Sequence, residues 1–236
     1  MSAFRFSVRQ ILIALVLISI SRPFLVTAWG QLVENILFSF LLISSLMAVG
    51  SGKKELVISL ILILPAISSR WLTQLFALQP NDVFPVICVT LALGLVIWQM
   101  LRFVIRTRKV DGDTLCAGIS VYLLLANIWS FFYLLTERFV PASFRFPGLP
   151  GHGTQLTPDE ASYFSFCTIT TAGYGDIIPT SPHARSLATL ESTAGVLYMA
   201  ILIGRLVALH LANQRAALQL REDLNALNGP MRGRGR

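Results

Sequence analysis

The segment Thr171–Gly175, with the sequence Thr-Ala-Gly-Tyr-Gly, carries residue types that can bind a dehydrated cation. A cation that leaves water needs oxygen ligands in place of its hydration shell, and an extended backbone offers a series of carbonyl oxygens. Gly173 and Gly175 allow backbone conformations that other residues rarely adopt, so successive carbonyl groups can point to one side. The Thr171 hydroxyl can add a further oxygen ligand at one end of this ladder.

One chain provides only one side of such a ladder, so a closed ring of ligands requires several copies of the chain. Asp176 follows directly, and a ring of its carboxylates would concentrate cations at the mouth of a pore. Asp176 can equally act as a turn residue that binds nearby backbone amides, and the two roles are compatible. The segment therefore predicts a homo-oligomeric cation site.

The elements before this segment are marked by local signals. Val140–Gly153 is rich in proline and glycine and is expected to be a loop. Thr157 is a candidate N-cap, Pro158 fits the first helical position, and Glu160 completes a capping box, which predicts a helix from Pro158 to about Ile169. This helix is too short to span a membrane. It points its partially negative C-terminal end toward the cation site.

The composition indicates a membrane protein, because 54% of the residues are hydrophobic, only 13% are charged and the mean hydropathy is +0.67. This composition also excludes a disordered chain. Six apolar segments predict transmembrane helices, the first being the weakest: Val8–Ala28, Gln31–Gly50, Glu55–Leu78, Val83–Ile105, Thr114–Phe139 and Leu187–Leu211. The first segment could instead be a cleaved signal peptide. The short helix and the glycine-rich strand then form a re-entrant loop between the last two spans, and such backbone is stable at membrane depth only when it lines water or is buried in protein.

Most of the 19 Lys and Arg residues lie near the termini and in alternate loops, so both termini are expected in the cytoplasm. The net charge of +7 fits this distribution and gives no reason to expect nucleic-acid binding. We predict three parts: a four-span domain at 1–110, a pore domain at 111–212 and a short basic cytoplasmic tail at 213–236. In the tail, Asn213–Leu227 can form a short helix, and Gly229–Arg236 is a basic stretch that could contact anionic lipids.

The sequence Thr170–Asp176 (Thr-Thr-Ala-Gly-Tyr-Gly-Asp), between two spans and after a capped short helix, resembles the selectivity filter of the potassium-channel superfamily. The resemblance covers about 114–211. It implies a tetramer in which the carbonyls of Thr171, Ala172, Gly173 and Tyr174 bind dehydrated potassium, Gly175 lines the mouth and Asp176 forms the outer ring. Further positions match the family's pore-helix hydroxyls, post-filter proline and inner-helix glycine: Ser165, Thr168, Thr170, Thr171, Pro179 and Gly195.

The sequence departs from the family pattern at three places around the filter. Ala172 stands where Val or Ile is usual, and its smaller side chain packs less tightly behind the ladder. Tyr163 and Phe164 replace a frequent Trp pair, and Phe164 has no hydrogen-bond donor. Cys167 stands where some members carry a Glu. We therefore expect a filter with fewer braces, which collapses slowly or loses selectivity at low potassium.

Two residues of the last span have alternative interpretations. Gly195 is either a hinge of the inner helix or a point of close packing against the pore helix. Glu191 is costly at membrane depth and should face protein or water, either in the central cavity or in a polar contact behind the filter. Both alternatives stay open at the level of the sequence.

A voltage sensor needs a basic residue at every third position through the fourth span, and Val83–Ile105 lacks this array. Upstream of Arg102 this span has no charged residue, and its first basic residues, Arg102 and Arg106, lie at the cytoplasmic end. We therefore predict weak or absent voltage sensing. The sequence contains no P-loop and no nucleophile elbow, and thus gives no support for an enzyme or a cofactor other than the permeant potassium.

We interpret the chain as a homotetrameric, potassium-selective channel, and its compact size favours the bacterial inner membrane. A weakly selective cation channel and a non-conducting modulatory subunit remain the alternatives.

Overall fold

The computed structural model describes residues 2–21, 28–47, 53–75, 83–107, 111–147 and 155–228. Over these ranges the chain is almost entirely helical, in agreement with the predicted all-α class, apart from two strands of two residues each. The elements are, in chain order, α1 (Ser2–Ser21), α2 (Ala28–Met47), α3 (Lys53–Leu75), α4 (Val83–Arg106), α5 (Gly112–Phe139), β1 (Phe144–Arg145), α6 (Pro158–Ile169), β2 (Ile178–Pro179) and α7 (Pro182–Asn228).

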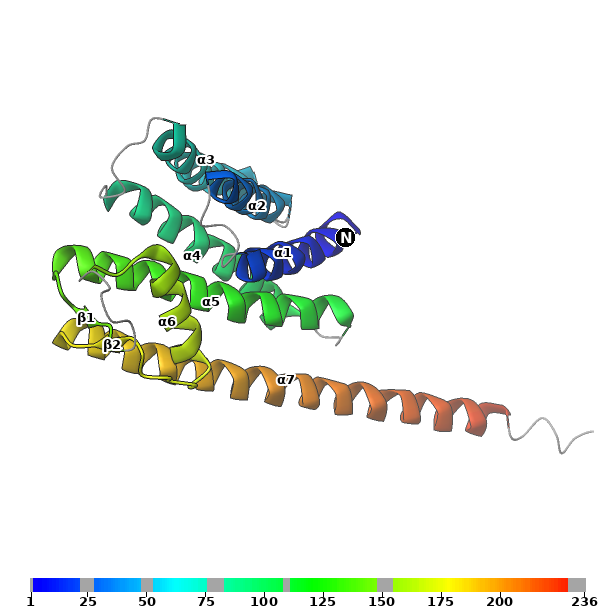
Figure 1. Ribbon diagram of the computed structural model, residues 1–236. Helices are drawn as coiled ribbons and strands as arrows, with labels where there is room; N and C mark the ends of the chain where they lie inside the picture. The colour runs from blue at the N-terminus through cyan, green and yellow to red at the C-terminus, as the bar shows by residue number, and fades with distance from the viewer. Residues whose placement is uncertain are drawn as a thin grey trace, which may run out of the picture.

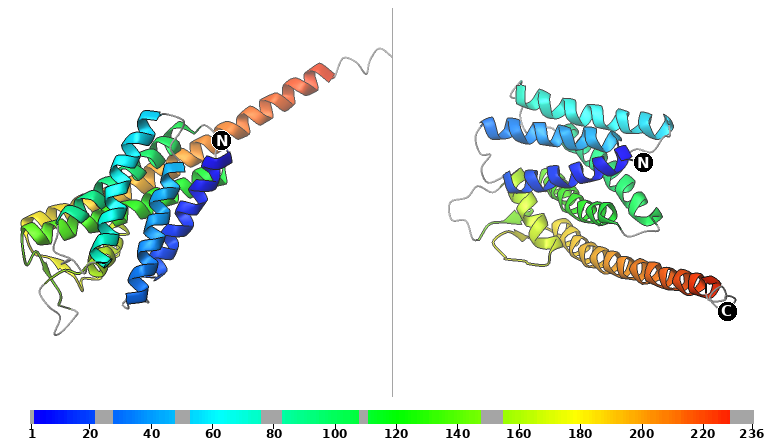
Figure 2. Two further views of the ribbon diagram at one scale, coloured as in Figure 1. Left: turned by 90° about the horizontal axis from the view of Figure 1, so that it is seen from above. Right: turned by 90° about the vertical axis from the view of Figure 1, so that its right-hand side faces the viewer.

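Helix α5 lies at the centre of the molecule and contacts α1 and α4 on one side and α6 and α7 on the other (Figure 1). Helices α2 and α3 lie farthest from α7, as the right-hand view of Figure 2 shows. The short helix α6 fills the angle between α5 and the first part of α7. This arrangement places the TTAGYGD segment (Thr170–Asp176) after α6 and beside α7.

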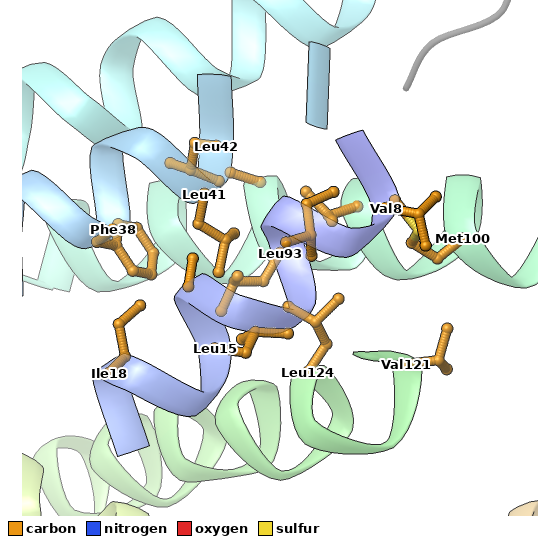
Figure 3. Packing of buried hydrophobic residues seen from close by; sticks show 14 of the residues in the cluster. Val8, Leu15, Ile18, Phe38, Leu41, Leu42, Leu93, Met100, Val121 and Leu124 are labelled. Carbon is orange, nitrogen blue, oxygen red and sulfur yellow. The ribbon is translucent and has the colours of Figure 1, made fainter. Parts of the chain in front are cut away.

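The larger apolar core joins α1, α2, α4 and α5, with contributions from α3 and α7 (Figure 3). The α1 side chains Val8, Ile11 and Leu15 are almost completely buried in it. Their spacing of three and four residues places them on one face of α1, which is the face that packs against α2 and α5. The apolar face of α1 thereby attaches the first three helices to the helix that supports the TTAGYGD segment.

A polar cluster joins α2 to α3 within the apolar bundle. Arg70 of α3 forms an ion pair of 3.3 Å with Glu34 and donates from Nε to the Asn35 side-chain oxygen at 2.8 Å. The same guanidinium lies 4.6 Å from the centre of the Phe38 ring. The Arg70–Glu34 pair is not evident from the sequence, because 36 positions separate the two residues.

Three helices within the described ranges are long and apolar enough to cross a membrane: Val83–Arg106, Gly112–Phe139 and Pro182–Leu209. Helices α1, α2 and α3 contain shorter apolar stretches, at Val8–Ile20, Leu32–Leu46 and Leu56–Leu72. The prediction of six spans therefore rests, for its first three members, on the sequence alone.

Helix α7 differs from the predicted tail. The sequence analysis expects that Asn213–Leu227 can form a short helix, and in the structure these residues are helical as the last part of α7, which continues from Pro182 to Asn228 over 47 residues. The expected boundary between 212 and 213 thus lies inside one helix. The basic stretch Gly229–Arg236 lies outside the described residues.

The loop predicted at Val140–Gly153 is described only as far as 147, and it contains the strand β1. Strand β1 pairs with β2 in antiparallel register, Phe144 opposite Pro179 and Arg145 opposite Ile178. The sequence analysis does not predict this pairing, because two-residue strands carry no periodic signal.

Candidate functional site

Helix α6 begins and ends where the local signals predict. The Thr157 hydroxyl accepts from the Glu160 amide at 3.3 Å, and the Glu160 carboxylate accepts from the Thr157 amide at 2.8 Å. Pro158 occupies the first helical position, and the helix ends at Ile169. The capping box fixes where α6 starts, and the length of α6 then fixes where the TTAGYGD segment begins.

Within the TTAGYGD segment the backbone alternates between left-handed and other conformations. Positive φ angles occur at every second residue: 58° at Thr171, 54° at Gly173 and 78° at Gly175. An added Cβ at either glycine would meet no atom within 4 Å, so backbone conformation and not space is the reason for glycine there.

The positive φ of Thr171 was not expected from the sequence. A β-branched residue rarely adopts this conformation, which costs on the order of 1–3 kcal/mol. The amides of Ala172 and Gly173 both donate to the Cys167 carbonyl, at 2.9 and 3.3 Å. These two hydrogen bonds tie the start of the segment to the end of α6 and hold the turn at Thr171.

The segment from Thr171 to Gly175 is exposed in the single chain, and the Tyr174 side chain is 74% exposed. Several apolar side chains of α7 are also exposed in the single chain, among them Leu190, Val196, Leu197, Ile201 and Ile203.

Tyr163 of α6 braces the carboxylate that ends the segment. Its hydroxyl donates to Asp176 Oδ2 at 2.6 Å, and its ring stacks on the ring of Tyr174 with 6.5 Å between the centres. The hydrogen bond to Asp176 raises the pKa of the Tyr163 hydroxyl, which therefore stays protonated in neutral solution. Asp176 also accepts from the Ile177 amide at 3.0 Å, which is the turn role considered for it.

The hydrogen bond from Tyr163 is a brace that the sequence analysis did not consider, and the expectation of a filter with fewer braces stays a prediction. A tyrosine ring is long enough for its hydroxyl to reach the carboxylate. Phe164 points away from the segment into an aromatic cluster, where its ring centre lies 4.9 Å from that of Tyr133 and 5.4 Å from that of Phe144, both in edge-to-face geometry.

Behind α6, Glu191 of α7 is completely buried. Its carboxyl group forms hydrogen bonds with the Tyr133 hydroxyl of α5 and the Ser165 hydroxyl of α6. Of the two positions considered for Glu191, the structure places it in the polar contact behind the segment. One side chain thus connects α5, α6 and α7.

Gly195 lies one helical turn beyond Glu191 and contacts the end of α6. An added Cβ at Gly195 would lie 2.6 Å from both the Ile169 carbonyl oxygen and its side chain. This geometry agrees with the close-packing interpretation of Gly195, whereas the hinge stays a prediction. The same Ile169 carbonyl accepts from the Tyr122 hydroxyl of α5 at 3.1 Å.

The chain that leaves the segment is anchored to the chain that precedes α6. The Ser143 carbonyl accepts from the Thr180 amide at 2.8 Å, beside the β1–β2 pairing. The Glu137 carboxylate at the end of α5 accepts from the Ala142 and Ser143 amides, each at 3.0 Å. Both ends of the TTAGYGD segment are thus attached to α5, directly or through β1.

The predicted ligands Thr171, Ala172, Gly173, Tyr174 and Gly175 are consecutive. Tyr163 braces two of the candidate site residues, Asp176 by its hydrogen bond and Tyr174 by ring stacking. The sequence analysis missed the supporting hydroxyls of Tyr122 and Tyr133 and named Tyr163 only as a departure from the family pattern. The sequence signal of Tyr122 and Tyr133 is that each carries, on an apolar helix, a hydroxyl that needs a partner when buried.

Near the end of the apolar part of α7, Arg205 connects α7 to α4. Its guanidinium donates to the carbonyls of Ile105 and Thr107, the latter at 3.0 Å, at the end of α4. A cation at this place interacts favourably with the carbonyl groups that a helix leaves unpaired at its C-terminus. The α4–α5 junction is thereby fastened to α7.

Comparison with known proteins gives one family match. A family model described as an ion channel matches residues 114–210, which contain nearly all of α5, the whole of α6, the TTAGYGD segment and the apolar part of α7. No curated protein and no solved structure matches the chain. The family match, together with the long apolar helices, supports an integral membrane protein with an ion-channel domain at 114–210.

Proposed function

We propose that the chain is the subunit of a homotetrameric, potassium-selective channel. In this proposal the carbonyl oxygens of Thr171, Ala172, Gly173 and Tyr174 and the Thr171 hydroxyl replace the hydration shell of potassium. Gly175 lines the mouth, and four Asp176 carboxylates raise the local concentration of cations there.

The alternating backbone of the TTAGYGD segment is the observation that carries this proposal. Carbonyl groups of an ordinary strand point alternately to opposite sides. Positive φ angles at Thr171, Gly173 and Gly175 break that alternation, because every second peptide group is turned. A row of carbonyls on one side is the ligand arrangement that a dehydrated cation requires.

The tetramer is supported by what one chain leaves uncovered. A one-sided row of ligands needs copies around an axis to surround an ion, and the segment is exposed in the single chain. Apolar residues of α7 are exposed in the single chain as well. Copies of the same surface packed around the axis would cover both.

We further propose six spans with both termini in the cytoplasm and little dependence on voltage. Helix α4 carries no charged residue before Arg102, and its buried residues are Val89, Thr90, Ala92, Leu93, Val96, Met100 and Val104. A span with uncharged buried positions has little charge to move through the membrane field.

The test is flux through purified protein in liposomes. We expect potassium flux that is lost when sodium replaces potassium, and no flux from the Gly173→Asp variant, in which a side chain and a charge disrupt a position with φ of 54°. Equal potassium and sodium flux would contradict selectivity. Absence of flux under all conditions of pH, voltage and lipid would contradict the channel itself.

A weakly selective cation channel is the second candidate, and Ala172 is the residue that favours it. The smaller side chain leaves less packing behind the ladder than the Val or Ile that is usual in the family. Ala172→Val would then raise the ratio of potassium to sodium flux, whereas a selective wild-type channel would gain little.

A further inference from the structure

The buried cluster behind α6 contains more hydrogen bonds than its hydroxyl groups can supply. Ser165 Oγ lies 2.6 Å from the Ala126 carbonyl oxygen and is also hydrogen-bonded to Glu191 Oε1. Glu191 Oε2 is hydrogen-bonded to the Tyr133 hydroxyl. These are three hydrogen bonds among four groups from α5, α6 and α7.

The hydrogens in this cluster can be counted. Tyr133 and Ser165 each carry one hydroxyl hydrogen, and the Ala126 carbonyl carries none. The Tyr133 hydrogen serves Glu191, and the Ser165 hydrogen serves Ala126. The contact between Ser165 and Glu191 then lacks a hydrogen, unless the carboxyl group itself provides it.

The surroundings of Glu191 also disfavour a charge. The side chain is completely buried, and no basic side chain in the described part of the chain forms an ion pair with it. The groups that face it are the hydroxyls of Tyr133 and Tyr122 on α5 and Ser165 on α6. An isolated carboxylate in such a site is expensive, and the usual result is that the group stays neutral.

We propose that Glu191 is a neutral carboxylic acid, that its proton is donated to Ser165 Oγ, and that this hydrogen bond positions α6, and with it the ion-conducting segment, against α7. The Ser165 hydroxyl in turn donates to the Ala126 carbonyl, and Tyr133 donates to the other carboxyl oxygen. Every hydrogen of the cluster then has one acceptor.

The proton on Glu191 can affect the TTAGYGD segment because the buried cluster lies just before the end of α6. Glu191 contacts Ser165, and one turn further along both helices Gly195 contacts Ile169. The TTAGYGD segment begins directly after Ile169. Removal of the proton leaves the single Ser165 hydroxyl hydrogen with two acceptors, the Glu191 carboxylate and the Ala126 carbonyl. One of these two contacts then lacks a hydrogen, and α6 loses part of what fixes its position.

The first part of the test does not depend on conduction. Infrared difference spectra between the wild-type protein and Glu191→Gln, both purified in detergent, should contain a carboxylic-acid carbonyl band at neutral pH. The band should disappear at alkaline pH in the wild-type protein and be missing from the Gln variant. If neutral wild-type protein shows only the bands of an ionised carboxylate, the proposal is overturned, whatever the flux.

The second part uses flux and rests on the proposed channel function. Glutamine accepts from Tyr133 and donates from its amide to Ser165, so Glu191→Gln should keep potassium flux and selectivity and lose their pH dependence. The potassium flux of the wild-type protein should fall roughly threefold to tenfold at alkaline pH, which is the factor expected for the loss of one hydrogen bond.

Ser165→Ala provides the matched control, because it removes the acceptor of the proposed proton and leaves Glu191 in place. It should lower the ratio of potassium to sodium flux at all pH values. If Glu191→Gln abolishes flux, or if the wild-type and Gln proteins share one pH profile, the positioning role is refuted. If no variant conducts, the infrared measurement still decides the protonation state.

Discussion

At the scale of single residues, the phenol group of Tyr163 is the main side-chain support of the carboxylate that ends the TTAGYGD segment. Its hydrogen bond to Asp176 and its stacking on Tyr174 both restrain the end of the segment. The brace connects α6 directly to the residue that follows the proposed ion ligands.

Tyr163→Phe keeps the ring and removes the hydroxyl. We expect this variant to lose potassium conduction roughly threefold to tenfold faster than the wild-type protein during sodium-only exposure, because one hydrogen bond less holds the segment. Recovery of potassium flux in liposomes, after increasing times in sodium, measures this rate.

A double-mutant cycle with Asp176→Asn is the control. If Tyr163 acts through Asp176, the two substitutions together should have little more effect than either one alone. Fully additive effects would show that the hydroxyl acts elsewhere.

Sequence reasoning at this scale succeeds where the cause is local. The conformations of Gly173 and Gly175 follow from the freedom of glycine alone. The positive φ of Thr171 cannot be predicted in this way. Hydrogen bonds from the amides of Ala172 and Gly173 to the Cys167 carbonyl impose it on a residue that disfavours this conformation. The partners of Glu191 are equally hidden, since Tyr133 is 58 positions away in the chain.

At the scale of elements, the contact of α7 with the end of α6 depends on the absence of a side chain at Gly195. Helix backbones approach closely only where small residues meet. The Ile169 carbonyl is fixed at this point by the Tyr122 hydroxyl, so neither helix has space for an added methyl group.

Gly195→Ala should therefore destabilise the protein by roughly 1–3 kcal/mol, since the new methyl group displaces backbone and not only a flexible side chain. The thermal unfolding temperature in detergent is the measurement. Gly204→Ala is the matched control, because an added Cβ there meets nothing within 4 Å on the same helix.

A Gly195→Ala protein as stable as Gly204→Ala would contradict the close packing. Stability that is unchanged, combined with altered channel opening, would instead favour the hinge interpretation of Gly195.

The prediction of elements was most accurate for α6 and least accurate for the end of α7. The capping box at Thr157 and Glu160 is a local signal with a defined geometry, and it located the start of α6. Nothing in the sequence around Leu211 or Ala212 stops or continues a helix strongly, so the continuity of α7 was not apparent. The β1–β2 pairing depends on contacts between distant segments and was likewise not predictable.

At the scale of the whole molecule, the single chain has an incomplete surface. The TTAGYGD segment and several apolar side chains of α7 are exposed in the single chain, and α2 and α3 lie on the side of the molecule that is far from α7 (Figures 1 and 2). The composition indicates a membrane protein. The proposed tetramer rests instead on this exposed surface and on the one-sided row of carbonyl ligands.

Mixed assembly tests the proposed tetramer. If one Gly173→Asp chain blocks a pore, equal amounts of wild-type and variant chains that assemble at random leave roughly one sixteenth of tetramers fully wild-type. Potassium flux should fall to about that fraction of the flux from wild-type protein at equal total amount.

Native mass measurement of the same preparation is the control for assembly. A fall of flux to only about one half would indicate conduction by single chains, and about one quarter would indicate dimers. Either result would contradict the tetramer.

The uninterrupted course of α7 has a mechanical consequence. At a rise of 1.5 Å per residue its 47 residues extend about 70 Å, more than twice the thickness of about 30 Å of a bilayer core. The apolar part of α7 ends at Leu209, so the last 19 residues of the helix extend about 30 Å beyond it. Arg205 fastens α7 to the α4–α5 junction just before this point, so the extension begins at an anchored position.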